Sequence, residues 1–201
     1  MSTTRHCSHL TRAAILAFAA VVGLNPVCAA SPESEKAASA TQQQVRFLGL
    51  QTTLPSRWQR VDPSSTMRLA QFVAPGHERG QSAELIFYYF GAGQGGTPEA
   101  NIVRWRSQFQ DADGAPPVPE VTRFDVSGMP VARVKLQGSY ARGIGAGPGG
   151  AGKPNQTLLV ALLQTPRGQV TIQLHGDTPL IDALEPEFDR MLRKIAPASI
   201  P

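Results

Sequence analysis

Three glycines stand where a nucleotide phosphate could be bound. Gly91, Gly93 and Gly96 form the pattern Gly-x-Gly-x-x-Gly between a run typical of a strand and a run typical of a helix. In dinucleotide-binding proteins such glycines let backbone amides approach a pyrophosphate at the N-terminus of a helix. Asp111 follows the motif by about 20 residues, the distance at which an acid usually binds the ribose.

The runs around this motif do not have the order of a dinucleotide-binding unit. Such a unit has a strand, a helix and a parallel strand, with the acid at the carboxyl end of the second strand. Asp111 instead ends the helix-like run and precedes a proline-rich loop, and the neighbouring runs have the spacing of hairpins. We therefore interpret residues 91–96 as a connection that needs positive φ angles before a helix capped by Thr97. No cofactor is expected.

A second glycine-rich stretch, residues 143–155, contains the same spacing by chance. The glycines that reproduce this spacing are Gly145, Gly147 and Gly150. The stretch from Gly147 to Lys153 nearly matches a phosphate loop, but Pro154 replaces the Ser or Thr that would hold Mg²⁺, and a strand-like run follows. We interpret it as a hairpin loop. A ligand-binding lid is the alternative, because long loops in compact domains are often functional.

The other reactive side chains do not form a catalytic or metal-binding set. Beyond residue 30 the chain has two histidines, His77 and His175, and no cysteine or Gly-x-Ser-x-Gly motif. Arg104 and Arg106 lie beside Trp105 and could attract an anion toward the glycines; a solvated helix face is the alternative. The candidate binding residues are Gly91, Gly93, Gly96, Arg104 and Lys153. No catalytic residue and no metal ligand is assigned.

Residues 1–30 have the pattern of a signal peptide. Arg5 and Arg12 form a basic region without acids, and residues 13–24 are apolar over a length that is short for a membrane span. Small residues that a signal peptidase reads follow near residue 30. The predicted location is therefore periplasmic or secreted. A lipid on Cys28 is the disfavoured alternative, since the preceding residues fit a lipoprotein signal poorly.

Removal of residues 1–30 would change the chemistry of the chain. Both cysteines, Cys7 and Cys28, would be lost, which excludes disulfides and thiol catalysis in the mature domain. The 19 basic residues of the chain would become 17, against 15 acidic ones, because only two arginines are removed. This near-neutral balance disfavours nucleic acid as a partner. No stable membrane insertion is expected after cleavage, a periplasmic protein partner is the kind expected, and the oligomeric state stays open.

The remaining chain has the organisation of one domain. Residues 31–44 are small and polar and predict a disordered leader, and residues 45–197 have the size of a single α+β domain. Strands are expected at 45–53, 67–74, 83–90, 121–126, 131–140, 157–165 and 169–175. The run 85–90 is apolar on both faces and predicts a central strand. Alternation in 131–140 places Arg133 and Lys135 on a face that meets solvent.

Two helices are expected to pack on this sheet. Thr97-Pro98-Glu99 is a helix start, and Ile102, Trp105 and Phe109 form the buried stripe of the first helix. Apolar residues of the second recur at 181, 184, 188, 191 and 195, and Pro186 predicts a kink or the true helix start. The predicted fold is α+β, a curved, mainly antiparallel sheet of about six to eight strands with two main helices packed on it.

Several segments resemble a family of uncharacterised exported bacterial proteins. They are Leu54-Pro55-Ser56-Arg57-Trp58 and residues 64–72, 90–96, 101–109 and 188–192. The order of elements and the Leu-Pro-x-x-Trp turn also resemble the PsbP-like α/β sandwich. This resemblance implies an accessory, assembly or adaptor role without catalytic residues.

Two classes of function follow from these patterns. The first is an exported, non-enzymatic binding or accessory domain, which is favoured because no catalytic constellation is found. The alternative is a small-molecule (anion) carrier or an enzyme that uses the glycine-rich loops 91–97 and 143–155.

Overall fold

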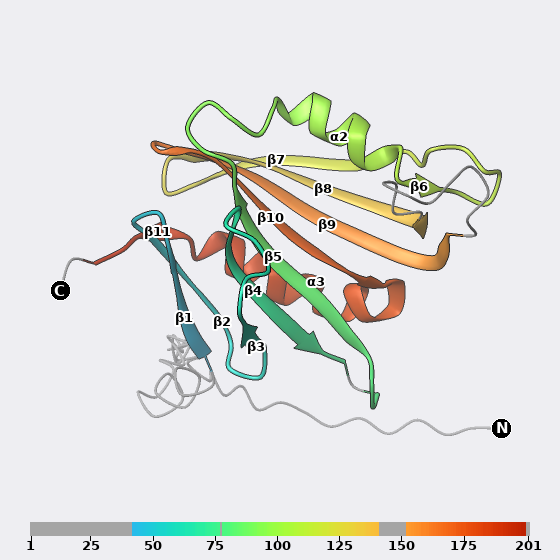
Figure 1. Ribbon diagram of the computed structural model, residues 1–201, viewed down its shortest axis with the longest axis horizontal. Coiled ribbons are helices and arrows are strands. Elements are labelled where there is room, and N and C mark those ends of the chain that lie inside the picture. Colours follow the sequence, from blue (N-terminus) through green and yellow to red (C-terminus); the bar gives the residue numbers. More distant parts are fainter. Residues whose placement is uncertain (1–41, 77, 141–151, 200–201) are drawn as a thin grey trace, which may run out of the picture.

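The computed structural model describes residues 42–76, 78–140 and 152–199. These residues form two sheets and two helices (Figure 1). The expected signal peptide, residues 31–41 of the expected leader, His77 and residues 143–151 of the second glycine-rich stretch lie outside the described residues. No helix of the described ranges is both long and apolar enough to cross a membrane.

The larger sheet has eight strands in the order β3-β4-β5-β10-β9-β8-β6, and β7 also pairs with β8. Its strands are β3 (Gln59–Val61), β4 (Arg68–Pro75), β5 (Ser82–Tyr89), β6 (Phe109–Gln110), β7 (Glu120–Val126), β8 (Met129–Tyr140), β9 (Lys153–Thr165) and β10 (Gly168–Asp177). All of its pairings are antiparallel, as predicted. The predicted central strand is β5, which lies between β4 and β10.

A smaller sheet consists of β1 (Gln42–Phe47), β2 (Leu50–Pro55) and β11 (Ala196–Pro197). The first strand begins at Gln42, earlier than the expected domain start at Val45, so the last residues of the expected leader are ordered. Their backbone pairs with β2, and the Gln43 side chain donates a hydrogen bond to the Pro55 carbonyl over 3.1 Å. A polar segment can form an edge strand because its backbone groups supply the pairing.

Helix α3 (Thr178–Arg193) covers one face of the larger sheet. Its buried residues are Leu180, Ile181, Leu184, Phe188, Met191 and Leu192. The helix begins at Thr178 and continues through Pro186, so the expectation that Pro186 marks the start is wrong. Pro186 is exposed. Burial of the apolar face of α3 stabilises the helix and compensates for the backbone hydrogen bond that a proline cannot donate.

Helix α2 (Pro98–Arg106) lies on the opposite face of the same sheet (Figure 1). The Thr97 hydroxyl accepts a hydrogen bond from the Ala100 amide over 3.2 Å, which is the predicted cap. Trp105 of this helix packs on β8 and β9 through Val134, Leu136, Leu158, Val160 and Leu162. Phe109 belongs to the same apolar cluster but lies in β6, beyond the end of the helix.

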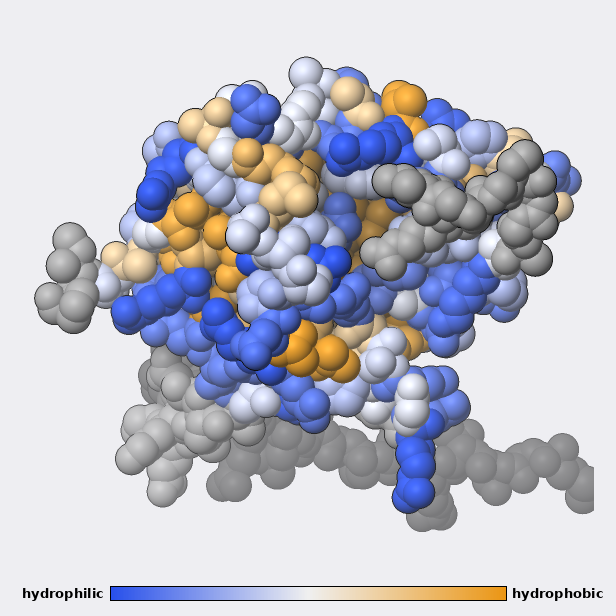
Figure 2. Space-filling model, viewed as in Figure 1, coloured by the Kyte–Doolittle hydropathy of each residue, from blue (hydrophilic) through white to orange (hydrophobic). Residues whose placement is uncertain are grey.

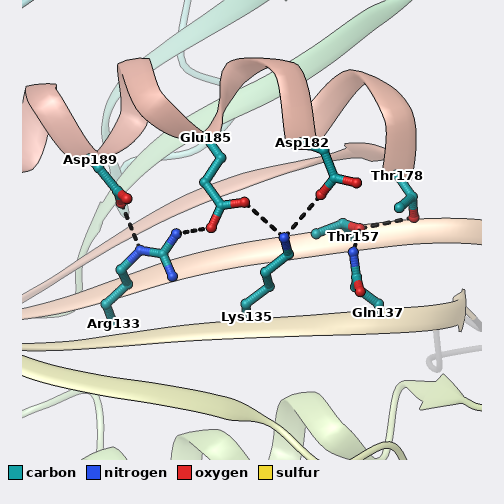
Figure 3. A network of polar contacts seen from close by, with 8 residues as sticks. All are labelled: Arg133, Lys135, Gln137, Thr157, Thr178, Asp182, Glu185 and Asp189. Carbon is teal, nitrogen blue, oxygen red and sulfur yellow. Dashed lines mark hydrogen bonds and ion pairs between the residues drawn. The ribbon is translucent and has the colours of Figure 1, made fainter. Parts of the chain in front are cut away.

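The face of β8 that was expected to meet solvent lies under α3. Arg133 and Lys135 point toward the helix and contact its acidic residues (Figure 3). These are Asp182, Glu185 and Asp189, which recur at helical spacing on one side of α3. The expectation was wrong because alternation identifies a polar face but does not show whether charged groups of another element cover it.

Candidate functional site

A cavity of about 470 Å³ lies on the sheet face that carries α2. The helix packs on β8 and β9 and leaves the adjoining parts of β5 and β10 open. The lining residues are Glu84, Ile86, Tyr88, Phe90, Arg104, Trp105, Gln108, Tyr140, Leu158, Thr171, Gln173 and His175. Figure 2 shows hydrophilic and hydrophobic residues intermixed on this side of the molecule, with the surface hollowed below α2.

Strand register explains why polar side chains gather in the cavity. Residues of β10 and β5 that lie opposite each other share a face, and the pair His175 and Glu84 both line the cavity. The alternate residues Val170, Ile172 and Leu174 face the α3 core instead. In the sequence, polar residues recur at positions 169, 171, 173 and 175. This alternation was the signal that the strand has a polar face opposite its apolar one.

One wall of the cavity is aromatic. The rings of Tyr88 and Phe90 lie nearly parallel, with centroids 5.9 Å apart and an interplanar angle of 7°. The Arg68 guanidinium lies 5.5 Å from the centroid of the Tyr88 ring. Trp105 enters the cavity from α2 and is otherwise buried in the apolar cluster of that helix. Flat rings and a guanidinium form a surface on which planar groups stack.

The opposite end of the cavity is acidic and hydrogen-bonded. The Glu84 carboxylate accepts hydrogen bonds from Gln71 Nε2 over 2.7 Å and from Arg68 Nη1 over 3.3 Å. The His175 ring lies 4.6 Å from the Tyr140 ring, measured between centroids. Arg68 therefore already neutralises the negative charge of Glu84.

A buried asparagine, Asn101, stabilises the end of the cavity that lies next to α2. Asn101 Nδ2 donates hydrogen bonds to the carbonyl oxygens of Gly95 over 2.6 Å and of Thr97 over 3.0 Å. Its Oδ1 accepts a hydrogen bond from Arg104 Nη2 over 2.5 Å. Asn101 thus fixes both the loop that enters α2 and the direction of the Arg104 guanidinium. Arg104 forms no ion pair with any residue in the described part of the chain.

The glycine residues predicted from the sequence lie in the connection between β5 and α2. Gly96 and Arg104 together line a more open recess of about 540 Å³ beside the cavity. Gly91 and Gly93 lie in the same loop but line neither hollow. All three glycines have positive φ angles, and Thr97 caps the helix that follows, as expected for a structural connection.

Lys153 lies apart from the other predicted residues. It begins β9, and its Nζ is 2.8 Å from Asp177 Oδ1. Hydrogen bonds from Lys153 and then Gln156 hold the pKa of Asp177 below its ordinary value. The structure therefore brings Arg104 and Gly96 together and does not add Lys153 to them.

Several lining residues were not found from the sequence. Glu84 and Tyr88 belong to β5, Thr171 and Gln173 belong to β10, and Gln108 lies in the connection between α2 and β6. Within the described ranges, no cluster of His, Cys, Asp or Glu has the composition of a metal site. The chemistry that the arrangement offers is stacking on aromatic rings, hydrogen bonding, the Glu84 carboxylate that Arg68 pairs with, the His175 imidazole and the Arg104 guanidinium.

The structure is similar to solved structures of known proteins, although no protein-family model and no curated protein sequence matches the chain. One is the cyanobacterial PsbP protein (CyanoP) from Synechocystis sp. PCC 6803, with 16% identity, a TM-score of 0.49, and coverage of 91% of this chain and 99% of that one. Another is the Ran-binding protein Mog1p from Saccharomyces cerevisiae, with 12% identity, a TM-score of 0.47, and coverage of 78% and 95%.

A third similar structure is PA94, a Pseudomonas aeruginosa protein of unknown function, with 15% identity, a TM-score of 0.43, and coverage of 79% and 99%. The molecule is an α+β sandwich with a helix on each face of an antiparallel sheet, as predicted from the sequence. At these identities and TM-scores the comparisons carry no information about a ligand or a partner.

Proposed function

We propose that the protein is an exported binding domain whose ligand site is the cavity between α2 and the open part of β5 and β10. The cavity itself carries this proposal. Its volume of about 470 Å³ is in the range of small-molecule sites, which usually combine apolar walls with a few converging polar groups. Its aromatic wall and its polar groups come from a rigid sheet and a helix that is tied to it by a buried cluster.

The polar groups of the cavity are of a kind that binds ligands without covalent chemistry. The side chains of Gln108 and Gln173 have no hydrogen-bond partner within the part of the chain that the structure describes, and both line the cavity. Amides supply both donors and acceptors, so they can recognise polar substituents of a ligand. Binding without catalysis therefore accounts for the polar side chains of the cavity, and no catalytic residue or cofactor has to be added.

A ligand panel tests this function. Thermal unfolding would be followed in the presence of small acids, amines, sugars and aromatic compounds, because a ligand that binds the folded state raises the melting temperature. A ligand at 100 times its Kd contributes about 2.7 kcal/mol, which corresponds to a shift of about 5–10 °C for a domain of this size.

Two matched variants assign any shift to the cavity. Gln173→Trp would fill the cavity from β10, whereas Gln110→Trp would add the same side chain at an exposed position on β6. The shift should persist in Gln110→Trp and disappear in Gln173→Trp. A shift that is equal in both variants would place the ligand elsewhere and would refute the proposed site.

Export is part of the same proposal and has its own test. Residues 1–30 have a basic region, an apolar run and small residues in the order of a cleaved signal. The mature protein, purified from native cells, should begin near Ala30 or Ser31 when its N-terminus is sequenced. An N-terminus at Met1 in the mature fraction would rule out cleavage.

An adaptor that contacts a periplasmic protein is the second candidate function. Apolar side chains are exposed at Val103 of α2, at Val118 and at Val121 of β7. A photo-crosslinking amino acid at Val121 should capture one specific protein in native cells, and the same group at Gln44 on β1 should not. Absence of a specific crosslink at Val121 would count against the adaptor role.

A further inference from the structure

The two ends of the cavity carry opposite charges. Arg104 lies at the end near Phe90, because both residues also line the recess of the glycine loop. Glu84 lies toward the other end of β5, where it is opposite His175 in the strand register. The ligand that the proposed function requires would therefore meet a cation at one end and a carboxylate at the other.

The two charges differ in how far they are already neutralised. Glu84 contacts the Arg68 guanidinium as well as Gln71. Arg104 donates to a neutral amide oxygen of Asn101, and it has no carboxylate partner among the described residues. A guanidinium has five N–H donors in a planar fork, so the donors that Asn101 does not use can bind a carboxylate with two parallel hydrogen bonds. The cavity should accordingly prefer an anion.

The wall between these ends favours a flat ligand. Tyr88 and Phe90 present nearly parallel rings, and Trp105 contributes a third aromatic side chain from the helix. Aromatic groups stack in an offset or edge-to-face arrangement on such surfaces. An inorganic anion would use Arg104 and leave this wall uncovered, and a neutral aromatic compound would leave the guanidinium without a counterion.

We propose that the cavity binds a planar aromatic carboxylate. The carboxylate would lie on Arg104, whose direction Asn101 fixes, and the ring would lie against Tyr88, Phe90 and Trp105. A cavity of about 470 Å³ accommodates an acid with one or two fused rings. This inference rests on the proposed function and specifies the chemical class of its ligand.

Because the chain has two tryptophans, ligand binding can be followed through the signal of each tryptophan separately. Trp105 lines the cavity, whereas Trp58 is fully buried and its Nε1 donates to Glu187 over 3.1 Å. In two-dimensional ¹H–¹⁵N spectra each indole N–H gives one signal, and Trp105→Phe assigns them. The probes are benzoate and naphthalene-2-carboxylate, each compared with its neutral amide. The acids should shift the Trp105 signal and leave the Trp58 signal in place.

The affinities of acid and amide measure the role of the guanidinium. Each acid should bind about tenfold more tightly than its amide, as expected for charge-assisted hydrogen bonds. Arg104→Gln should remove this difference by weakening the acid about tenfold. Arg106→Gln is the matched control on the same helix, because Arg106 Nε donates to the Pro117 carbonyl over 2.8 Å and does not line the cavity.

Failure of the ligand class can be told apart from failure of the proposed function. If acids and amides bind equally and Arg104→Gln changes neither, the carboxylate preference is wrong, although the cavity still binds ligands. If none of the four probes shifts Trp105, the ligand class is wrong, and the function stands only if another compound of the panel stabilises the protein through the cavity. If Arg104→Gln binds the acids as tightly as the unmodified protein does, while the acids still bind more tightly than their amides, the assignment of the guanidinium would also be overturned.

Discussion

Glu185 of α3 accepts a hydrogen bond from Arg133 of β8 on the sheet face that the helix covers (Figure 3). The other carboxylate oxygen of Glu185 accepts from Lys135 Nζ over 2.7 Å. The side chains of Arg133 and Lys135 are only 10% and 13% exposed. One carboxylate therefore serves two largely buried cations and connects the helix to the sheet.

Replacing Glu185 with alanine should destabilise the fold. The variant leaves Arg133 and Lys135 under α3 with only Asp189 and Asp182 as acidic partners. Removing one member of a buried ion pair costs about 3–5 kcal/mol, and the remaining acids should reduce this to about 2–3 kcal/mol. Thermal unfolding followed by circular dichroism should show a melting temperature lower by about 5–10 °C.

A variant without the three most buried charges provides the control for this interpretation. Arg133→Met, Lys135→Met and Glu185→Leu together remove the two cations and the carboxylate that they share and keep the volume, and such exchanges are often neutral or stabilising. Asp182 and Asp189 lose their partners, but their side chains are 48% and 37% exposed and can be solvated. The triple variant should therefore recover most of the stability that Glu185→Ala loses. If it is as unstable as the single variant, packing of the helix rather than unpaired charge explains the loss.

Acid should weaken the attachment of α3 to the sheet. Burial raises the pKa of Glu185, but hydrogen bonds from Lys135 and Arg133 outweigh it and hold this pKa below its ordinary value of 4.5. Because the folded pKa is depressed, the stabilisation is present above pH 4.5 and is lost as the pH falls through the folded value. Free energies of unfolding from denaturant titrations should decrease in that range, and Glu185→Gln should flatten the decrease.

The same network should also weaken at high pH. Burial lowers the pKa of Lys135, but hydrogen bonds to Glu185 and Asp182 outweigh it and raise this pKa above 10.5. The folded pKa is raised, so the contribution of Lys135 is present below pH 10.5 and is lost as the pH rises through the folded value. Lys135→Met should make the stability less sensitive to pH in this range, and an unchanged slope would contradict the assignment.

Asn101 should matter more for stability than the helix cap beside it. Its buried side chain donates to the Gly95 and Thr97 carbonyl oxygens, and the Thr97 oxygen also accepts from the backbone amide of residue 101. Asn101→Ala therefore leaves the Gly95 oxygen without this donor, at a cost of about 1–3 kcal/mol. Thr97→Ala removes one exposed cap at a cost of about 1 kcal/mol. Hydrogen exchange of the first-turn amides of α2 should accelerate in both variants. Equal stability of the two would show that Asn101 does not hold the loop.

Gly138 allows two strands to approach each other at the edge of the cavity. A Cβ at this position would lie 2.4 Å from the carbonyl oxygen of Gln110 in β6. Gly138→Ala should therefore displace β6 and lower the free energy of unfolding by about 2–3 kcal/mol. The nearby Tyr140, which lines the cavity, should move with it, so ligand binding should weaken as well.

Gly128→Ala is the matched control for the glycine variant. Gly128 has a positive φ of 74° in the turn between β7 and β8, and an added Cβ there meets no atom within 4 Å. Its substitution should cost only the backbone strain of about 1 kcal/mol and leave the cavity intact. Denaturant unfolding of both variants separates the close approach at Gly138 from a general cost of replacing glycine.

Much of the fold could be predicted from local patterns. The hairpin of β9 and β10, the cap at Thr97 and the apolar stripe of α3 follow from alternation, helix-start residues and helical spacing. The candidate site could be predicted only in part. Arg104 was identified because it lies beside Trp105 on the helix that follows the glycine loop, whereas Glu84 and Gln173 looked like ordinary polar residues of two strands.

The amino-acid sequence by itself determined which residues favour strands and helices and which of their faces are apolar, because periodicity records the local environment of each side chain. It also predicted that the glycines 91, 93 and 96 belong to a connection before a helix capped by Thr97, as the structure has it. Only the tertiary structure decided that α3 covers Arg133 and Lys135 and that β5, β10 and α2 enclose one cavity. Those outcomes depend on pairing between distant segments, which local periodicity does not specify.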